Sequence, residues 1–455
     1  MQRPTRRSFL SAVASAAATP ALGAPRRPLP QPEEPPSSGL VDAVVVGAGA
    51  AGIAAGRRLA AAGKRLVLLE ASDRAGGRCL TDTASFGVPY DRGAHWLYNA
   101  DSNPVARFAA QTGLDLYRAP PGQRVRIGRR YAREGEMEDF LAGLVRASTS
   151  IAEAARKGDT SCAQVLPKDL GDWQSTVDFV LGPYNCGKDL SEISTVDLAR
   201  STERENSAFC RQGLGALLSK LATRLPLQLS APVTEIDYQN RRGVVLNTSK
   251  GRFVASAAII TVSTNVLTSG KLRFVPELPR RHLDAAAKLK LGSYDHVALE
   301  LLGNPLGLRA DELVFEKSGS KQTASIFANV SGSSLCIVDV GGSFGRELSA
   351  KGTAAMVDFA LSWLTGLYGP HIKSAVKRRH ATRWNQEPWV LGASSTAAPG
   401  AQTARRIIVE PLAGRVFFAG EAAHETLWGT VGGAWETGER AADAVIRALG
   451  GGRRG

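Results

Sequence analysis

Cysteine is scarce in this chain: 455 residues include only five, at positions 79, 162, 186, 210 and 336. The number is odd, and no pair has the Cys-x-x-Cys spacing or the spacing of a zinc site. These absences exclude a disulfide scaffold, and no metal site is expected. One disulfide among Cys162, Cys186 and Cys210 stays open, because the sequence does not indicate which thiols meet.

Long apolar runs are absent as well. No stretch reaches the roughly 18 consecutive apolar residues that a membrane-spanning helix needs, so we expect no transmembrane segment. Aromatic residues make up 6% of the chain, and they do not interleave with its short basic runs. Proteins that bind single-stranded nucleic acid combine a basic groove with aromatic stacking platforms. The net charge of +14 therefore predicts a solvated basic surface and no nucleic-acid partner.

The remaining composition is typical of a large globular protein. Hydrophobic residues account for 44% of the chain and charged residues for 22%. At roughly 150 residues per domain, the length allows two to three domains. Glycine is abundant, with 48 residues, which favours tight turns and close backbone approaches of the kind found in nucleotide-binding proteins.

The first 24 residues predict a targeting segment that is not part of the fold. Arg6 and Arg7 precede Ser8-Phe9-Leu10, a weakly apolar stretch follows, and residues 21–24 are small enough for a cleavage site. Paired arginines in this setting resemble the twin-arginine export signal, which implies a periplasmic location. Residues 25–37 contain six prolines and predict a linker.

A dinucleotide-binding pattern opens the mature chain. Residues 41–46 have the composition of a buried strand, and residues 47–52 read Gly-Ala-Gly-Ala-Ala-Gly. Residues 53–62 then predict an alanine-rich helix, and residues 64–70 predict a second strand that ends in an acid. The strand, turn, helix and terminal acid together form the complete β–α–β fingerprint, which is far more specific than an isolated glycine motif.

Each residue of this fingerprint has a physical task. Gly47 permits the tight turn, Gly49 lets the backbone approach a pyrophosphate, and Gly52 lets the helix pack closely on the strand. The helix N-terminus presents unpaired N–H groups and a positive dipole end to the phosphates. Glu70 is placed to accept hydrogen bonds from ribose hydroxyls, and an acid at this position disfavours NADP.

The residues after Glu70 distinguish FAD from NAD through a family resemblance. Glu70-Ala71-x-x-Arg74-x-Gly76-Gly77-Arg78 resembles the FAD-binding signature of the flavin-containing amine oxidases, a family that includes monoamine and polyamine oxidases. Residues 91–96 resemble the family's segment beside the flavin ring, and similar blocks recur up to residues 429–434. The FAD contacts that the resemblance and the fingerprint imply are Gly47, Gly49, Ala51, Gly52, Glu70, Ala71, Arg74, Gly77, Arg78, Gly93, Ala94, His95, Trp96, Val233, Gly420, Glu421, Thr430 and Val431.

Two of these implied contacts carry specific expectations. Glu421 would accept a hydrogen bond from a ribityl hydroxyl of the flavin. A helix that starts near Thr430 would direct its N–H groups and dipole at the flavin ring.

The resemblance also implies the fold class, α/β. A Rossmann-like FAD-binding domain of the glutathione-reductase type would be joined to an α+β substrate-binding domain. The block order places the FAD-binding domain at residues 38–115, 211–268 and 381–450, and the substrate-binding domain at residues 116–210 and 269–380.

Sequence patterns predict some of the elements inside these domains. Residues 136–156 and 190–220 look helical, whereas residues 297–302 and 334–341 alternate as strands do. Lys250-Gly251 predicts a hairpin turn.

The sequence departs from the family pattern at the expected reaction centre. His296 stands where the family commonly has a lysine that holds a water near the flavin. A histidine could hold that water or move a proton near neutral pH, so His296 is the candidate catalytic residue. The alternative is a histidine with an ordinary structural hydrogen bond.

The expected substrate pocket departs from the family pattern too. Ser394 replaces one aromatic residue that usually flanks the amine, and Thr430 stands where the other can lie. Tyr98 and Trp428 are therefore candidates to shape the pocket, with core packing as the alternative for the tryptophan. Ala393 stands where some members attach the flavin through a cysteine, so noncovalent FAD is expected.

These features predict an FAD-dependent oxidoreductase that acts on a small-molecule amine. Hydride transfer to the flavin would give an imine, which water hydrolyses, and oxygen or a periplasmic carrier would reoxidise the flavin. Two alternatives stay open, namely a same-fold flavoenzyme that acts on C–C bonds and a non-catalytic flavin-binding protein. The oligomeric state also stays open, with a dimer as one alternative.

Overall fold

The structure is a computed structural model that describes residues 40–451. The expected export signal at residues 1–24 and the linker at residues 25–37 lie outside the described residues. Among the helices of residues 40–451, none combines the length and the apolar character needed to cross a membrane.

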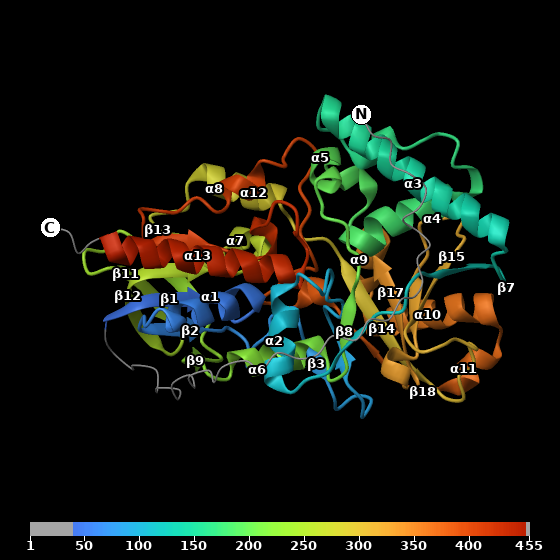
Figure 1. Ribbon diagram of the computed structural model, residues 1–455, viewed down its shortest axis with the longest axis horizontal. Helices are drawn as coiled ribbons and strands as arrows, with labels where there is room; N and C mark the ends of the chain where they lie inside the picture. Colours follow the sequence, from blue (N-terminus) through green and yellow to red (C-terminus); the bar gives the residue numbers. More distant parts are fainter. Residues whose placement is uncertain (1–39, 452–455) are drawn as a thin grey trace, which may run out of the picture. The chain divides into compact units, whose positions relative to one another are not determined.

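The first of two large sheets is built around the strand of the dinucleotide fingerprint (Figure 1). Its strands are β1 (Leu40–Val46), β2 (Leu66–Leu69), β9 (Leu227–Gln228), β10 (Val233–Asp237), β11 (Val244–Thr248), β12 (Gly251–Ile260), β13 (Arg273–Val275) and β19 (Val416–Phe418). Their order is β13-β10-β11-β12-β1-β2-β9, and β19 pairs with the last residues of β12, beyond the part that β11 covers. β1 is parallel to both of its neighbours, β2 and β12.

Helices bury both faces of this sheet. Ala43 and Val45 of β1 face a core that α1 (Ala50–Ala61), α6 (Leu214–Ala222) and α13 (Val431–Gly451) complete, and α1 and α13 lie side by side in Figure 1. Val44 and Val46 face the opposite core, which includes residues of α8 (Arg280–Lys288) and α12 (Ala404–Ile407). A parallel strand covered on both faces needs a nearly continuous apolar run, which is what residues 43–46 supply.

The second large sheet carries the other half of the site. Its order is β18-β14-β17-β16-β15-β6-β7, with bounds β18 (Val376–Ala381), β14 (Tyr294–Leu301), β17 (Leu335–Gly341), β16 (Ser325–Ala328), β15 (Glu312–Glu316), β6 (Arg124–Ile127) and β7 (Arg130–Tyr131). Successive residues of β15 face different cores, because side chains alternate along a strand. Val314 packs with α10 (Thr353–Tyr368), and Phe315 packs with α3 (Glu134–Lys157) and α4 (Gln174–Phe179).

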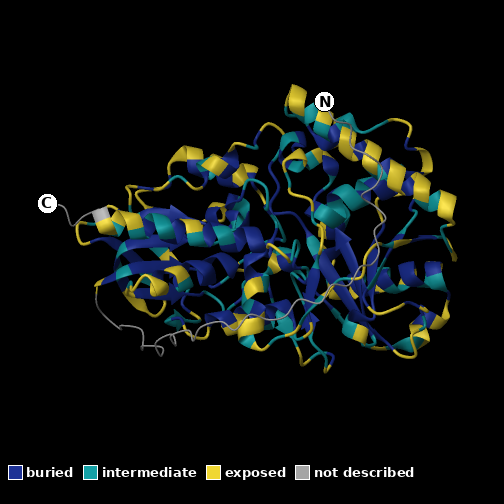
Figure 2. Cartoon of the chain, viewed as in Figure 1, coloured by how far each residue is buried: buried dark blue, intermediate teal, exposed yellow. Residues whose placement is uncertain are grey.

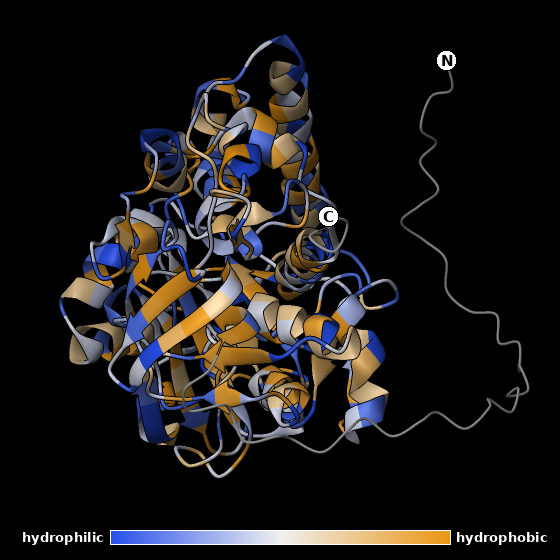
Figure 3. Ribbon diagram, turned by 90° about the vertical axis from the view of Figure 1, so that its left-hand side faces the viewer, coloured by the Kyte–Doolittle hydropathy of each residue, from blue (hydrophilic) through white to orange (hydrophobic). Residues whose placement is uncertain are grey.

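Shorter elements complete the described residues. Two small antiparallel sheets pair β3 (Thr81–Asp82) with β4 (Tyr90–Asp91) and β5 (Leu116–Arg118) with β8 (Ala208–Cys210). The remaining α-helices are α2 (Pro104–Thr112), α5 (Thr195–Ala199), α7 (Thr264–Thr268), α9 (Gly342–Ala350) and α11 (His371–Ala375). Figure 2 shows the buried strands in dark blue, and Figure 3 shows many strand residues in orange, as hydrophobic, beside helices that carry both blue and orange residues.

The fold class is the predicted one, but several local expectations change. The helix expected at 136–156 is present as α3, and the turn at Lys250-Gly251 joins β11 to β12. The helix expected at 190–220 is wrong. A short 3-10 turn, α5, β8 and α6 occupy that range, because Ser194 caps a new helix and Gly213 has a φ of 94° that no helix accommodates.

The expected boundary at residue 269 lies too early. β13 pairs in parallel with β10 of the first sheet, and Phe274 of β13 shares a core with Ala285 and Ala286 of α8. Residues 273–288 therefore pack with the dinucleotide-binding sheet, and the chain returns to the second sheet only at β14.

Cysteines and surface charges follow simple rules of burial. All five cysteines are buried and free, so the disulfide that the sequence left open is not formed.

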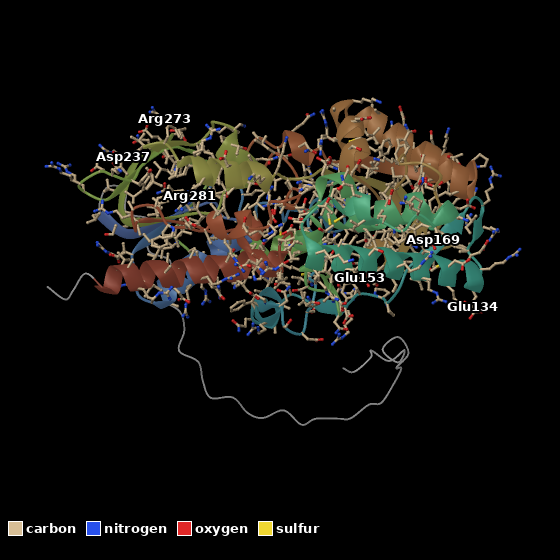
Figure 4. All side chains as sticks on the ribbon, turned by 90° about the horizontal axis from the view of Figure 1, so that it is seen from above. Glu134, Glu153, Asp169, Asp237, Arg273 and Arg281 are labelled. Carbon is tan, nitrogen blue, oxygen red and sulfur yellow. The ribbon has the colours of Figure 1, made fainter. Side chains whose placement is uncertain are left out.

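Figure 4 shows Glu134 and Glu153 of α3 at one side of the molecule and Arg273 and Arg281 at the other. The side chains of these two arginines are 71% and 63% exposed, which is where solvated charges belong.

Candidate active site

A cavity of about 330 Å³ lies between the first turn of α1 and the second sheet. Ligand pockets typically measure about 300–1,000 Å³. Residues from both large sheets line the cavity, so the two halves of the described chain form one site. The predicted residues that line it are Gly47, Gly49, Ala51, Glu70, Ala71, Arg74, Gly77, Arg78, Gly93, Ala94, His95, Trp96, Tyr98, Val233, His296, Ser394, Gly420, Glu421, Thr430 and Val431.

The turn between β1 and α1 has the shape of a phosphate cradle. A Cβ on Gly52 would lie 1.8 Å from the Gly47 carbonyl oxygen, so Gly52 holds the turn closed and does not line the cavity. A Cβ on Gly49 would meet no protein atom nearer than the Gly77 Cα at 3.9 Å. No side chain caps the N-terminus of α1, so its N–H groups are available to an anion.

Glu70 is held in place with capacity left for a ligand. One carboxylate oxygen accepts the Ala48 N–H at 2.7 Å, and the other accepts the N–H and hydroxyl of Ser72 at 2.9 and 2.8 Å. Because each oxygen accepts about two hydrogen bonds, one lone pair of Glu70 remains free at the cavity wall. This geometry fits a ribose hydroxyl, so the nucleotide half of the cavity fits FAD.

Glu421 differs from its expected role. One of its oxygens accepts from Arg78 at 2.9 Å and from the Ser395 N–H at 3.0 Å, and the other accepts from the Ser395 hydroxyl and the Gly429 N–H, both at 2.8 Å. These four bonds use the lone pairs of both oxygens, so no acceptor remains for a ribityl hydroxyl. Burial alone would raise the pKa of Glu421, but the charges of Arg78 and Arg405 lower it. Glu421 therefore fixes the loops that line the cavity.

The N-terminus of α13 is a second helix end at the cavity. The Thr430 hydroxyl caps it by accepting the Gly433 N–H at 3.0 Å, and Thr430 and Val431 line the cavity. Helix N-termini favour a negative charge, which agrees with the role expected for this helix.

Aromatic side chains form the far end of the cavity. We call Trp96, Tyr98, Tyr184, Tyr294 and Phe327 the aromatic end. The Trp96 and Tyr98 rings stack with centroids 6.1 Å apart and a 4° interplanar angle, and the Tyr184 and Tyr294 rings meet at 6.1 Å. Such walls exclude water and orient an apolar ligand.

Trp428 was a wrong candidate for this pocket. Its side chain is fully buried in a core with Cys162, Cys186 and Ile193, and its indole N–H donates to the Asp197 carbonyl at 3.4 Å. Trp428 is therefore a core residue, as the alternative interpretation predicted.

His95 is fixed at the wall of the cavity by a carboxylate. Its Nδ1 lies 2.9 Å from Asp91, which also accepts the Leu214 N–H at the start of α6. The imidazole stacks on Phe209 with centroids 4.5 Å apart. Its buried Nε2 has no partner among the described residues and remains available to a ligand.

His296 is held from both sides. Nδ1 lies 2.5 Å from a carboxylate oxygen of Asp339, its register partner on β17, and Nε2 lies 3.0 Å from the Gly93 carbonyl oxygen. Both partners only accept hydrogen bonds, so both ring nitrogens carry a proton and His296 is an imidazolium. Burial lowers the pKa of His296, but the charge and hydrogen bond of Asp339 and the Gly93 carbonyl outweigh this effect, so the pKa lies above 6.5.

This geometry changes the role expected of His296. Neither ring nitrogen has a free lone pair with which to accept a proton from water or substrate. His296 instead forms an ion pair with Asp339 and ties β14 to the Gly93 segment beside the cavity.

The charge state of His296 gives a pH prediction. Because the folded-state pKa is raised, its contribution to stability is complete below pH 6.5 and is lost as the pH rises through the folded-state pKa. We expect the difference in unfolding free energy between wild type and His296→Gln to shrink as the pH rises from 6 to 9. Urea unfolding across this range measures it, and a difference that grows with pH would contradict the imidazolium.

Sequence reasoning missed several residues of the cavity. Asp339 had a signal, since it is the one charged residue in the apolar strand Leu335–Val340. Tyr294 lies two residues before His296 on β14 and so shares its face of the strand. Arg204 and Asn185 had no signal, because only the tertiary structure brings their loops to the cavity.

Comparisons with known proteins identify the family that this chain matches. The profile of the family described as flavin containing amine oxidoreductase matches residues 50–446. Human lysine-specific histone demethylase 2 is 26% identical over 453 residues, which cover 88% of this chain and 53% of the demethylase. Rice polyamine oxidase 5 is 28% identical over 440 residues, which cover 89% of this chain and 88% of the oxidase. The chain thus spans about half the length of the demethylases it matches.

Solved structures share the fold. Putrescine oxidase bound to putrescine has a TM-score of 0.77 and 19% identity, with 90% of this chain and 99% of that chain covered. Cyclohexylamine oxidase from Brevibacterium oxydans has a TM-score of 0.75 and 20% identity, with 90% and 100% covered.

Proposed function

The chain belongs to the flavin-containing amine oxidoreductase family, and from this premise we propose that it is an FAD-dependent enzyme that oxidises the C–N bond of a small amine. The observation that carries the proposal is one cavity that runs from the phosphate cradle of α1 to the aromatic end. A nucleotide site and a dry aromatic pocket that share one space are what hydride transfer from a bound amine requires.

The residues of this chain perform binding, orientation and exclusion of water. The α1 N-terminus would hold the pyrophosphate and Glu70 a ribose hydroxyl, while FAD, when bound, supplies the acceptor for the hydride that leaves the carbon beside nitrogen. The aromatic end orients the amine. His296 and Asp339 form a hydrogen-bonded ion pair beside the cavity, which holds the wall of the pocket without adding net charge.

We propose that the FAD is bound noncovalently. Ala393, at the cavity wall, offers no nucleophile. Cys79 is the single cysteine that lines the cavity, and burial raises its pKa to about 12, so its thiol is protonated at neutral pH. Acid precipitation is expected to leave FAD in the supernatant.

Anaerobic flavin reduction tests the proposed function. Amines added to the FAD-loaded protein without oxygen are expected to bleach the flavin absorbance, because the hydride has no other destination. Admission of oxygen, or of a redox carrier, should then restore the colour, and release of hydrogen peroxide identifies oxygen as the acceptor. A flavin that dithionite reduces but that no member of a broad amine panel reduces would contradict amine oxidation.

Export to the periplasm through the twin-arginine route is a further part of the proposal. It is supported by the order Arg6-Arg7-Ser8-Phe9-Leu10 before a weakly apolar stretch. A reporter fused after residue 30 is expected to reach the periplasm, and Arg6→Lys/Arg7→Lys is expected to keep it inside, as cell fractionation would show. Export that survives the double substitution would point to the general secretory route.

A further inference from the structure

The charges at the aromatic end do not cancel. Asp339 and His296 face each other across β17 and β14 as a hydrogen-bonded carboxylate and imidazolium, so this pair is neutral as a unit. Arg204 also lines the cavity, and Tyr98 and Tyr184 lie within the electrostatic influence of both Arg204 and Asp339. One positive charge therefore remains in the part of the cavity where the amine would lie.

Arg204 is positioned but has no carboxylate partner among residues 40–451. Its Nη1 donates to the carbonyl and the side-chain oxygen of Asn185, both at 2.9 Å. Its guanidinium carbon lies 5.0 Å from the centroid of the Tyr98 ring. These contacts fix the plane of the guanidinium and leave its remaining N–H groups without an anion.

Nη2 of Arg204 lies next to Gly429 and Ser394 in the wall of the cavity. A Cβ on Gly429 would lie 3.4 Å from Nη2 of Arg204 and 3.4 Å from Cβ of Ser394. Both residues are small and both line the cavity. The wall beside Nη2 is therefore built from small residues, which place little bulk next to the guanidinium.

We propose that the substrate is an amine that also carries a carboxylate, and that Arg204 binds this carboxylate; the inference rests on the proposed amine oxidation. A fixed guanidinium presents parallel N–H donors that match the two oxygens of a carboxylate. Its positive charge repels the second ammonium group of a diamine or polyamine. Pairing of Arg204 with the carboxylate also leaves the amine free to be neutral.

A matched substrate series tests the proposal. The series consists of three amines with the same aromatic frame. Benzylamine carries no second group, 4-(aminomethyl)benzoate adds a carboxylate, and 1,4-bis(aminomethyl)benzene adds a second amine. Phenylalanine places the carboxylate on the carbon that would lose the hydride. At least one carboxylated amine is expected to reduce the flavin about 10- to 100-fold faster per mole than benzylamine, the range of a charged hydrogen bond, and the diamine is expected to be slowest.

Variants of Arg204 identify the residue responsible. Arg204→Gln is expected to lower the preference for the carboxylated amine over benzylamine by about 10- to 100-fold, and Arg204→Lys, which keeps the charge but loses the fork, by less. Arg146→Gln, which makes the same change at an exposed arginine of α3, is the control and should keep the wild-type preference. An unchanged preference in Arg204→Gln, or a diamine that wild type oxidises fastest, would overturn the proposal.

A titration with benzoate separates failure of this inference from failure of the proposed function. Benzoate carries the carboxylate without an amine, and its binding to the FAD-loaded protein can be followed by calorimetry. Binding by wild type that weakens at least tenfold in Arg204→Gln supports the anion site even if no amine reduces the flavin. Equal binding by both proteins overturns the inference even if amines are oxidised.

Discussion

The substitution Gly52→Ala is expected to prevent the protein from folding, whereas Gly49→Ala is expected to give a folded protein that does not bind FAD. The added Cβ of Gly52→Ala would lie 1.8 Å from the Gly47 carbonyl oxygen and 2.9 Å from its carbon. Backbone atoms cannot yield as a flexible side chain can, so the cost exceeds the ~1–3 kcal/mol of ordinary overpacking. A typical domain has only ~5–15 kcal/mol of stability to lose.

The methyl group of Gly49→Ala would not clash with any protein atom. Gly49 has a φ of −78°, which alanine adopts without strain, and the nearest protein atom to the new Cβ would be the Gly77 Cα at 3.9 Å. The methyl group instead occupies the approach of a pyrophosphate to the N-terminus of α1. Circular dichroism and the flavin-to-protein absorbance ratio measure the two effects separately. A yellow Gly49→Ala protein with full FAD content would remove this turn from the cofactor site.

The second large effect is expected at a buried ion pair. Arg405 and Asp197 have side-chain exposures of 1% and 2%, and the guanidinium donates to both carboxylate oxygens at 2.6 and 2.7 Å. Asp197→Asn leaves a guanidinium buried without its anion, which is expected to cost about 3–5 kcal/mol of unfolding free energy. Urea unfolding of the two proteins measures the difference.

The same substitution should weaken FAD binding indirectly. Asp197 also accepts the Ala397 N–H at 2.8 Å, and Arg405 donates to the Ala422 carbonyl at 2.9 Å, so the pair holds the segments on either side of Glu421 and Ser395. Asp169→Asn breaks an exposed pair with Arg146 and is the matched control, expected to stay within about 0.5 kcal/mol of wild type. Equal stability losses in Asp197→Asn and the control would show that the buried pair has no special role.

The dinucleotide half of the site could be predicted because its information is local. The tight turn, the phosphate cradle and the ribose acceptor lie between residues 47 and 70, and each follows from backbone geometry that neighbouring residues impose. The prediction about Glu421 was less accurate. Its carboxylate follows a strand as expected, but its hydrogen-bond partners Arg78 and Ser395 come from other parts of the chain, and only Gly429 lies nearby in the sequence.

The sequence by itself predicted the turn between β1 and α1 from its glycine spacing and the position of His296 on a strand from alternation, because both patterns are properties of consecutive residues. The fold class and a flavin cofactor were predicted from the resemblance to the amine oxidase family. Only the tertiary structure decided the protonation state of His296, because this state depends on Asp339 and Gly93, which lie far from His296 along the chain. The same holds for Arg204. Its side chain reaches the cavity together with Asn185, and sequence patterns do not show that these loops meet. Local patterns fix backbone conformation, whereas the charge balance of a buried site depends on which distant side chains share its low-dielectric space.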